Sequence, residues 1–204
     1  MHRANNVFWK YVSEKFPSYF NDEILEFGSH NVNGSIRIHY NNAKKYTGID
    51  WRAGDCVDVV CFAHEFNSDN KVKAILSASM LEHDIYWKQS LSKMISLMEE
   101  DAILVLSWGG ALNPRHNPEE APDNEFHSLK IEYVINFLKE NNLYINTALY
   151  EAELKNILEK PEDVSVLKTN PFTSSQGWGE YCLVAFNKNN SIGYISELLD
   201  EDKI

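Results

Sequence analysis

Two acids and two glycines are spaced in this sequence as a bound nucleotide would require. Glu26 lies near the end of a short apolar run, Gly28 follows it, and Gly34 closes the loop. Asp50 ends the next apolar run, 22 positions beyond Gly28. A glycine after a strand lets a ligand approach the backbone closely, and an acid after the next strand can bind ribose hydroxyls. The spacing predicts a nucleotide-type ligand over the carboxyl ends of parallel strands.

The residues between the two glycines indicate which nucleotide fits. A dinucleotide loop follows the pattern G-x-G-x-x-G, which seats a pyrophosphate at the N-terminus of a helix. Here the loop reads Gly28-Ser-His-Asn-Val-Asn-Gly34 and has no middle glycine, which disfavours an NAD-binding oxidoreductase. Glu26 suits the ammonium group of an amino acid better than it suits a pyrophosphate. Together these features favour S-adenosylmethionine (SAM) over NAD.

The elements that must position these residues alternate between strands and helices. Short apolar runs predict strands at 24–27, 46–50, 57–61, 72–77, 102–107, 143–150 and 180–186. Helical spacing predicts helices over 5–20, 84–99 and 128–142, and a short helix over 34–42 with Asn33 as N-cap. Such alternation implies parallel βαβ units, but the last two strands lack a clear crossover helix and are expected to pair antiparallel. The leading helix would pack on the sheet or cover the site.

The overall composition disfavours several classes of protein. The 204 residues carry a formal net charge of −11, so binding to nucleic acid is not expected. The three cysteines are too few and scattered for a disulfide framework or a zinc site, and Cys61 and Cys182 are expected to be buried thiols. No apolar run approaches the roughly 20 residues that span a bilayer, so a cytoplasmic protein without a membrane partner is expected. We expect one domain over 1–204, with a leading helix in 1–21 and an acidic tail at 189–204.

Five short motifs occur in order along the chain. They are Glu26-Phe-Gly-Ser-His-Asn-Val-Asn-Gly-Ser, Tyr46-Thr-Gly-Ile-Asp50, Val57-Asp-Val-Val-Cys-Phe-Ala-His64, Ser79-Met-Leu-Glu-His83 and Leu104-Val-Leu-Ser-Trp-Gly-Gly110. This series resembles the successive motifs of a small class I SAM-dependent methyltransferase of the type 11 sort, over roughly residues 22 to 150. The resemblance implies an α/β fold: a three-layer Rossmann-like sandwich around a seven-stranded, mostly parallel sheet whose last strand is antiparallel. It also implies SAM as cofactor, S-adenosylhomocysteine (SAH) as product, and methyl transfer to oxygen or nitrogen of a small-molecule or sugar-type acceptor, by a monomer or homodimer.

Carried over position by position, the resemblance assigns parts of the cofactor to individual residues. Glu26 and Gly28 would face the methionine end, Asp50 would bind the ribose, and Trp51 would lie against the adenine ring. The segment after the third strand would border the adenine edge, and the segment after the fourth would line the methyl-transfer face. The full set of expected cofactor contacts is Glu26, Gly28, Ser29, His30, Gly34, Asp50, Trp51, Ala63, His64, Ser79 and Leu81.

The sequence departs from the family pattern at two positions. Phe62 stands where an aspartate commonly receives the adenine amino group, and phenylalanine cannot accept that hydrogen bond. His30 stands where a second glycine is usual, and it would either shape the loop or reach the ligand. These departures leave a second hypothesis open, a non-catalytic ligand- or partner-binding protein on a methyltransferase fold.

His83 is the candidate catalytic residue. It follows the fourth predicted strand, and an imidazole could deprotonate a hydroxyl or amine nucleophile because its pKa lies near working pH. The alternative is that Glu82-His83-Asp84 merely starts a helix, with Asp84 as N-cap. Methyl transfer also needs little beyond in-line positioning, so a base is not obligatory.

The segment 109–127 holds three prolines and is long for a connection, which is typical of functional loops. It leaves the fifth predicted strand at the edge where ligands bind, so it is expected to form the substrate side. Trp108, Arg115 and His116 are the candidate acceptor contacts, with Arg115 able to read a carboxylate or phosphate. The histidines here have no compact metal-ligand spacing, so no metal is predicted.

Overall fold

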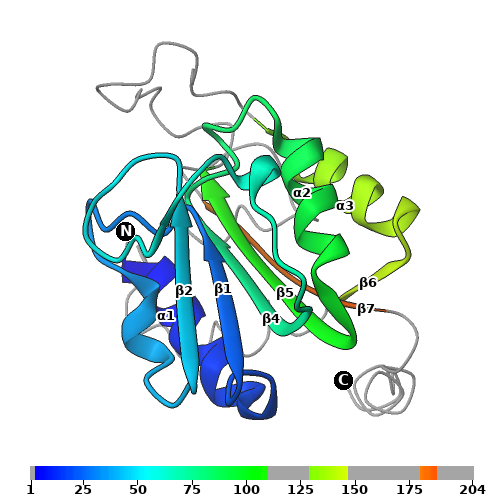
Figure 1. Ribbon diagram of the computed structural model, residues 1–204. Coiled ribbons are helices and arrows are strands. Elements are labelled where there is room, and N and C mark those ends of the chain that lie inside the picture. The colour runs from blue at the N-terminus through cyan, green and yellow to red at the C-terminus, as the bar shows by residue number, and fades with distance from the viewer. Residues whose placement is uncertain (1–2, 110–128, 147–179, 188–204) are drawn as a thin grey trace.

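Seven strands form a single twisted sheet in this protein (Figure 1). The computed structural model describes residues 3–109, 129–146 and 180–187. The strands lie in the order β3-β2-β1-β4-β5-β7-β6. Their bounds are β1 Glu23–Phe27, β2 Lys45–Asp50, β3 Val59–Val60, β4 Val72–Ala78, β5 Met98–Gly109, β6 Leu143–Asn146 and β7 Glu180–Asn187. Strands β1 to β5 pair in parallel, and β7 runs antiparallel to both β5 and β6. The predicted mostly parallel sheet with an antiparallel last strand is therefore confirmed.

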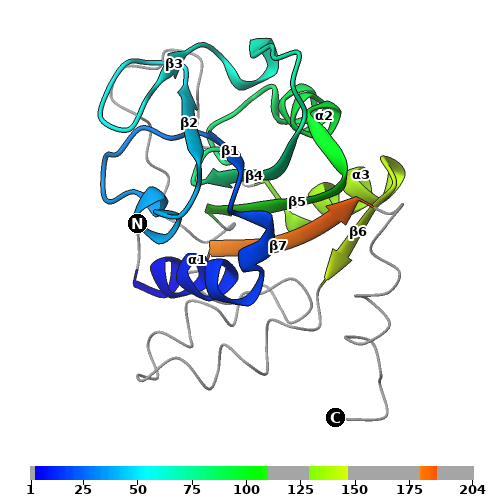
Figure 2. The same cartoon turned by 60° about the horizontal axis from the view of Figure 1, so that its bottom comes forward.

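Helices cover both faces of the sheet and complete a three-layer sandwich (Figure 2). Helix α1 (Arg3–Lys15) lies on one face, where its Phe8, Trp9 and Val12 join a buried apolar cluster. Helices α2 (Trp87–Ser96) and α3 (Ile131–Glu140) lie on the other face over a second cluster. Within the described residues, three short 3-10 helices connect these elements: η1 Pro17–Tyr19, η2 Ile36–His39 and η3 Ala63–Glu65.

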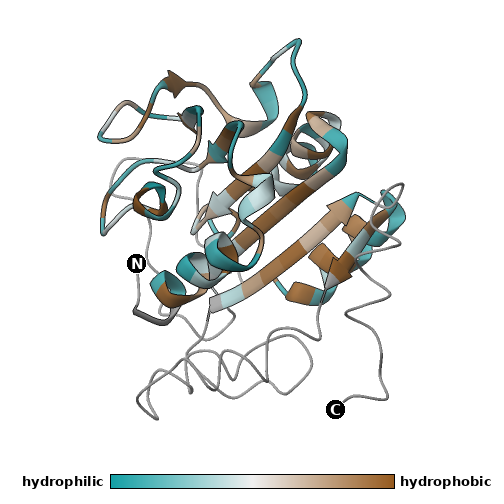
Figure 3. Cartoon of the chain, turned by 90° about the horizontal axis from the view of Figure 1, so that it is seen from below, coloured by the Kyte–Doolittle hydropathy of each residue, from teal (hydrophilic) through white to brown (hydrophobic). Residues whose placement is uncertain are grey.

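The central strands are apolar on both sides because both faces of the sheet are covered. In β5 the residues from Ala102 to Leu106 are all completely buried, and Figure 3 shows the hydrophobic colour running along this strand. Successive side chains of a strand point to opposite faces, so Leu104 joins the cluster under α2 while Val105 joins the cluster under α1. A strand buried on both faces is expected to read as a continuous apolar run, as this one does.

Two helix predictions were wrong in detail. The helix expected over 34–42 is only the 3-10 turn η2, and its N-cap is Ser35, whose side chain accepts the Arg37 N–H, and not Asn33. Most residues of this segment have low helix propensity, among them Gly34, Ile36 and Asn41. The helix expected over 84–99 begins only at Trp87, because the Asp84 carboxylate accepts the Tyr86 N–H inside a preceding turn, so Asp84 is not the N-cap.

Of the other predictions, some are met in part, and some concern segments outside the described residues. Cys182 is buried as expected, whereas Cys61 is only half-buried. Apart from Gly109, which ends β5, the expected substrate-side loop lies outside the described residues, and so does the acidic tail at 189–204. Within the described ranges, none of the helices combines the length and apolarity needed to cross a membrane.

Candidate functional site

The sheet has a topological switch between β1 and β4. The chain adds β2 and β3 on one side of β1 and β4 and β5 on the other, and ligands bind at such a point, outside the carboxyl ends of the strands. Glu26 pairs with Gly48 and Phe27 with Ile49, so Gly28 comes level with Asp50 at the end of β2. The fold thus brings the two acids and the first glycine together, as the sequence analysis expected.

Gly28 occupies a position that only glycine suits. Its φ is +81°, and its N–H donates to the Ile49 carbonyl at 2.8 Å. A Cβ built at this position would lie 2.6 Å from the Cβ of Met80, in the segment that follows β4. The sequence analysis expected a ligand to approach the backbone closely at Gly28. In the structure, the side chain that approaches Gly28 closely is Met80.

Gly28→Ala should destabilise the fold by about 2 kcal/mol or more, because it combines a strained left-handed backbone with a steric contact. Urea unfolding of the purified variant measures the loss. Gly34→Ala is the matched control. Gly34 also has a positive φ, +114°, but it is exposed, so the control shares the backbone strain without the steric contact. A Gly28→Ala protein as stable as the wild type would contradict the description of this turn.

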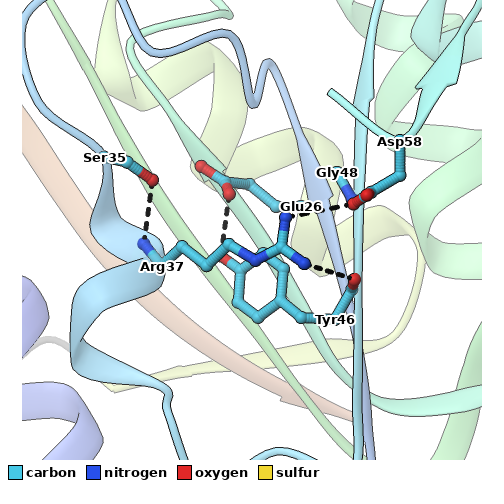
Figure 4. A network of polar contacts seen from close by, with 6 residues as sticks. All are labelled: Glu26, Ser35, Arg37, Tyr46, Gly48 and Asp58. Atoms are coloured by element: carbon cyan, nitrogen blue, oxygen red, sulfur yellow. Dashed lines mark hydrogen bonds and ion pairs between the residues drawn. The ribbon is translucent and has the colours of Figure 1, made fainter. Parts of the chain in front are cut away.

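Glu26 is a carboxyl group enclosed by the protein. Only 3% of it is exposed, and its Oε2 accepts a hydrogen bond from the Tyr46 hydroxyl at 2.8 Å (Figure 4). Burial raises the pKa of Glu26 to about 8, against the lowering effects of the Tyr46 hydrogen bond and the Arg37 charge. Without a ligand, Glu26 is therefore mostly protonated at pH 7. A nearby cation would favour its charged form, so the site is suited to an ammonium group.

A polar network outside Glu26 fixes the position of Tyr46 (Figure 4). The Arg37 guanidinium lies over the Tyr46 ring, 4.8 Å from its centroid, and Nη2 donates to the Tyr46 carbonyl at 3.1 Å. Arg37 also pairs with Asp58 at 3.2 Å, and Asp58 in turn accepts the Gly48 N–H at 2.7 Å. The sequence analysis missed Tyr46 and Arg37 as site residues, because their contacts depend on how β1, β2 and η2 pack together. Gly48 pairs with Glu26 across the strands, and a Cβ at Gly48 would meet the Cys56 carbonyl oxygen and the Ser29 side chain.

Asp50 is buried at the end of β2 and already orders the loops around it. Its Oδ2 accepts the His30 N–H and its Oδ1 accepts the Arg52 N–H, each at 3.2 Å. A carboxylate has about four acceptor positions, so each oxygen can still accept from a ribose hydroxyl. The Arg52 Nε donates to the His30 Nδ1 at 3.0 Å, and the His30 ring packs against Gly54. The His30 side chain therefore links the glycine loop to the loop after β2. Of the two roles expected for His30, these contacts support the shaping of the loop.

The expected adenine contacts lie beside this pair of loops. Trp51 is half-buried, and the Arg52 guanidinium lies 5.5 Å from its ring centroid. Ala63 and His64 belong to η3, just beyond β3. The His64 ring contacts the rings of Phe62 and Tyr86, with centroids 5.8 and 4.6 Å away. Phe62 and Tyr86 are each 43% exposed, so aromatic surface is available here.

The segment after β4 holds three of the expected residues. Ser79 is exposed in a left-handed conformation with a φ of +53°, and its N–H donates to the Ser107 carbonyl at 2.8 Å. Such strained residues cluster at functional sites. The His83 N–H donates to the Met80 carbonyl at 2.9 Å within a turn, and the catalytic role of His83 stays a prediction. Leu81 is completely buried in the core, which gives no support to contact through its side chain.

Two of the remaining expected residues, Trp108 and Ser29, are buried. Trp108 is completely buried, and its indole donates to the Leu129 carbonyl at 2.9 Å, so its placement gives no support to a contact with an acceptor. Ser29 is buried with its hydroxyl against Gly48. Arg115 and His116 lie outside the described residues. Across the part of the chain that the structure describes, no three His, Cys, Asp or Glu side chains are grouped to hold a metal ion.

Comparison with known proteins identifies the architecture. No protein-family model matches the sequence, and no curated protein matches it significantly. Among solved structures, the chain is similar to the 1,6-didemethyltoxoflavin-N1-methyltransferase of Burkholderia thailandensis, with a TM-score of 0.59, 11% identity, and 92% of this chain and 79% of that chain covered. A SAM-dependent methyltransferase from Clostridium acetobutylicum gives a TM-score of 0.57 at 8% identity, with 90% and 89% covered. Phosphoethanolamine N-methyltransferase 2 of Haemonchus contortus gives a TM-score of 0.57 at 11% identity, with 92% and 53% covered. The strand order, the antiparallel last strand and these likenesses together show that the chain has the fold of the class I SAM-dependent methyltransferases.

Proposed function

We propose that this protein is a SAM-dependent methyltransferase that acts on oxygen or nitrogen of a small-molecule acceptor. The observation that carries the proposal is the position of Glu26, Gly28 and Asp50 at the switch point of a methyltransferase-type sheet. In this proposal, the enclosed Glu26 carboxyl group faces the methionine end of the cofactor, and the Asp50 carboxylate binds its ribose. Neighbouring structures were solved with SAH or SAM, which supports the same cofactor here.

The residues of the chain would bind and orient the reactants. Bound SAM supplies a methyl group on a sulfonium, which is an excellent leaving group, so positioning contributes most of the catalysis. Glu26 accepts hydrogen bonds from the ammonium group and Asp50 accepts them from the ribose hydroxyls. His83 is the candidate base for an acceptor that must lose a proton. The neighbouring structures hold acceptors as different as 1,6-didemethyltoxoflavin and a desmethylplantazolicin analogue, so the shared fold does not select the acceptor.

Isothermal titration with SAM and with SAH tests the cofactor assignment, with NAD as the control ligand. The proposal expects both adenosyl ligands to bind with one-to-one stoichiometry and NAD to bind more weakly. Tighter binding of NAD would instead favour an oxidoreductase. Absence of binding by SAM and SAH at millimolar concentration would refute the proposal.

A second candidate is a non-catalytic ligand- or partner-binding protein, and Phe62 is the observation that favours it. Its ring is 43% exposed, and Val60, Ile85 and Tyr86 are also exposed large side chains, at 55%, 45% and 43%. Exposed apolar groups that gather in one region are typical of interaction sites. This candidate predicts a protein that binds a partner but turns over no acceptor when SAM is supplied.

Phe62→Asp separates the two candidates. If Phe62 packs on the adenine of a working site, the added charge removes that contact and SAH should bind roughly tenfold more weakly. If the site has degenerated, the restored acid should instead raise SAH affinity. Tyr133→Asp is the matched control, because Tyr133 is 56% exposed on α3 and the same charge is introduced there. Titration of SAH into the three proteins gives the answer.

A further inference from the structure

The side chain of Asn5, in the first turns of α1, is buried and has no hydrogen-bond partner among the described residues. Only 1% of Asn5 is exposed, and neither its Oδ1 nor its Nδ2 atom has a partner in that part of the chain. Buried side-chain amides almost always make hydrogen bonds, because burying one without a partner is costly. An unsatisfied amide at this position therefore requires an explanation.

Three contacts place the start of α1 beside the candidate site. Asn6 Oδ1 lies 2.8 Å from the His39 Nε2 in η2, and η2 directly follows the glycine loop. The Trp9 carbonyl accepts a hydrogen bond from the Tyr40 hydroxyl at 3.4 Å. The Trp9 indole donates to the Ser107 Oγ at 3.2 Å, near the carboxyl end of β5. The first turns of α1 thus lie beside η2 and the carboxyl end of β5.

The strand register gives the level of Asn5 relative to Glu26. Glu26 pairs with Leu76, and Leu76 pairs with Val105, so Ser107 lies two residues nearer the carboxyl edge than Glu26 does. Trp9 contacts Ser107 at that level. Ser107 follows Leu106, which is level with Phe27 through Ser77, so Ser107 is level with Gly28. Asn5 lies one helical turn before Trp9, about 6 Å along the helix axis. It therefore lies near the level of the glycine loop.

Asn5 and Glu26 belong to the same layer of the molecule. Asn5 shares a helical stripe with Trp9 and Val12, which pack in the cluster on the α1 face of the sheet. Ile24 also belongs to that cluster, and Glu26, two residues further along β1, points to the same face. The amide and the carboxyl group therefore approach the carboxyl edge from the same side.

We infer that Asn5 binds the α-carboxylate of the amino-acid part of the ligand, through its Nδ2 group, beside Glu26, which binds the ammonium group. The inference rests on the proposed function. The charged donors nearest the loop are already engaged, Arg37 with Asp58 and Tyr46, and Arg52 with His30. A neutral amide can donate to a carboxylate without neutralising Glu26, so the two residues together recognise both halves of a zwitterion.

The test compares SAH with 5′-methylthioadenosine, which has the adenosine and thioether parts but no amino-acid part. Asn5→Leu should weaken SAH binding by roughly tenfold or more and leave 5′-methylthioadenosine binding unchanged. Its melting temperature without ligand should match or exceed that of the wild type, because an unsatisfied amide has been removed. Asn6→Ala is the control in the same helical turn, and it should leave the ratio of the two affinities unchanged. Asn5→Ala provides a second variant in case leucine does not fit.

The outcomes separate this inference from the proposed function. A wild-type protein that binds neither compound overturns both. If the wild type binds SAH and both folded Asn5 variants keep the wild-type ratio of the two affinities, the inference alone is overturned. A fall in melting temperature, together with equal loss of both ligands, would show that Asn5 has only a structural role and would also overturn it.

Discussion

Replacing Glu26 with glutamine should make the ligand-free protein more stable at pH 8 and, at the same time, impair SAH binding. Burial raises the pKa of Glu26 to about 8 from an ordinary value of 4.5. Between these two values the folded protein keeps a proton that the unfolded chain has lost, so stability falls as pH rises through this window. Once the pH exceeds the upper value, the lost stability is roughly 3 to 5 kcal/mol. Glutamine keeps the shape of the side chain and still accepts the Tyr46 hydrogen bond, but it has no charge to bury.

Thermal and urea unfolding at pH 5 and pH 8 measure the effect. The stability difference between Glu26→Gln and the wild type should be small at pH 5 and should reach several kcal/mol at pH 8. Glu23→Gln is the control on the same strand, because Glu23 lies at the outer end of β1 and pairs with Lys45. It should show no comparable gain with rising pH.

The same variant should bind SAH roughly 10- to 150-fold more weakly, since a hydrogen bond to a charged group contributes about 1.5 to 3 kcal/mol. When the removal of a side chain stabilises the fold but weakens ligand binding, that side chain has a functional role and not a structural one. A Glu26→Gln protein that is less stable than the wild type at both pH values, or binds SAH equally well, would contradict the assignment.

Asp50→Asn should also weaken SAH binding by roughly 10- to 150-fold, because the ribose hydroxyls lose a charged acceptor. The asparagine oxygen can keep only part of the present pairing with the backbone N–H groups of His30 and Arg52, so about 1 kcal/mol of stability should be lost as well. Asparagine is preferred to alanine here, since alanine would leave both N–H groups without their partner.

Asp101→Asn serves as the control for Asp50. The Asp101 carboxylate pairs with Lys73 at 3.0 Å, and it lies in the first half of β5, away from the carboxyl edge of the sheet. Its substitution should leave SAH affinity unchanged. Titration of SAH into folded Asp50→Asn protein with a wild-type affinity would remove Asp50 from the site.

The sequence was informative where one residue type determined one local feature. The apolar runs identified the strands of the sheet, and the apolar run of β5 correctly indicated burial on both faces. Gly28 could be singled out because a tight turn after a strand requires glycine, and its φ of +81° agrees. Asp50 followed from its position at the end of the next strand. These inferences depend on chain order and local chemistry alone.

The features that the sequence did not reveal depend on tertiary contacts. The hydrogen bond of Tyr46 to Glu26 depends on the register between β1 and β2, which local patterns do not specify. Trp108 was expected near an acceptor, but the alternation of β5 directs it into the core, where Leu129 accepts its indole N–H. The position of Asn5 becomes clear only once α1 is docked against η2 and β5.

The most direct test of the account is the proton release that accompanies SAH binding. Titration of SAH at pH 7 in two buffers of different ionisation enthalpy gives the number of protons exchanged. Because Glu26 is mostly protonated without a ligand and must be charged to pair with the ammonium group, we expect release of roughly one proton per SAH. This release should disappear in Glu26→Gln. Absence of SAH binding at millimolar concentration, or binding without proton release, would contradict the account.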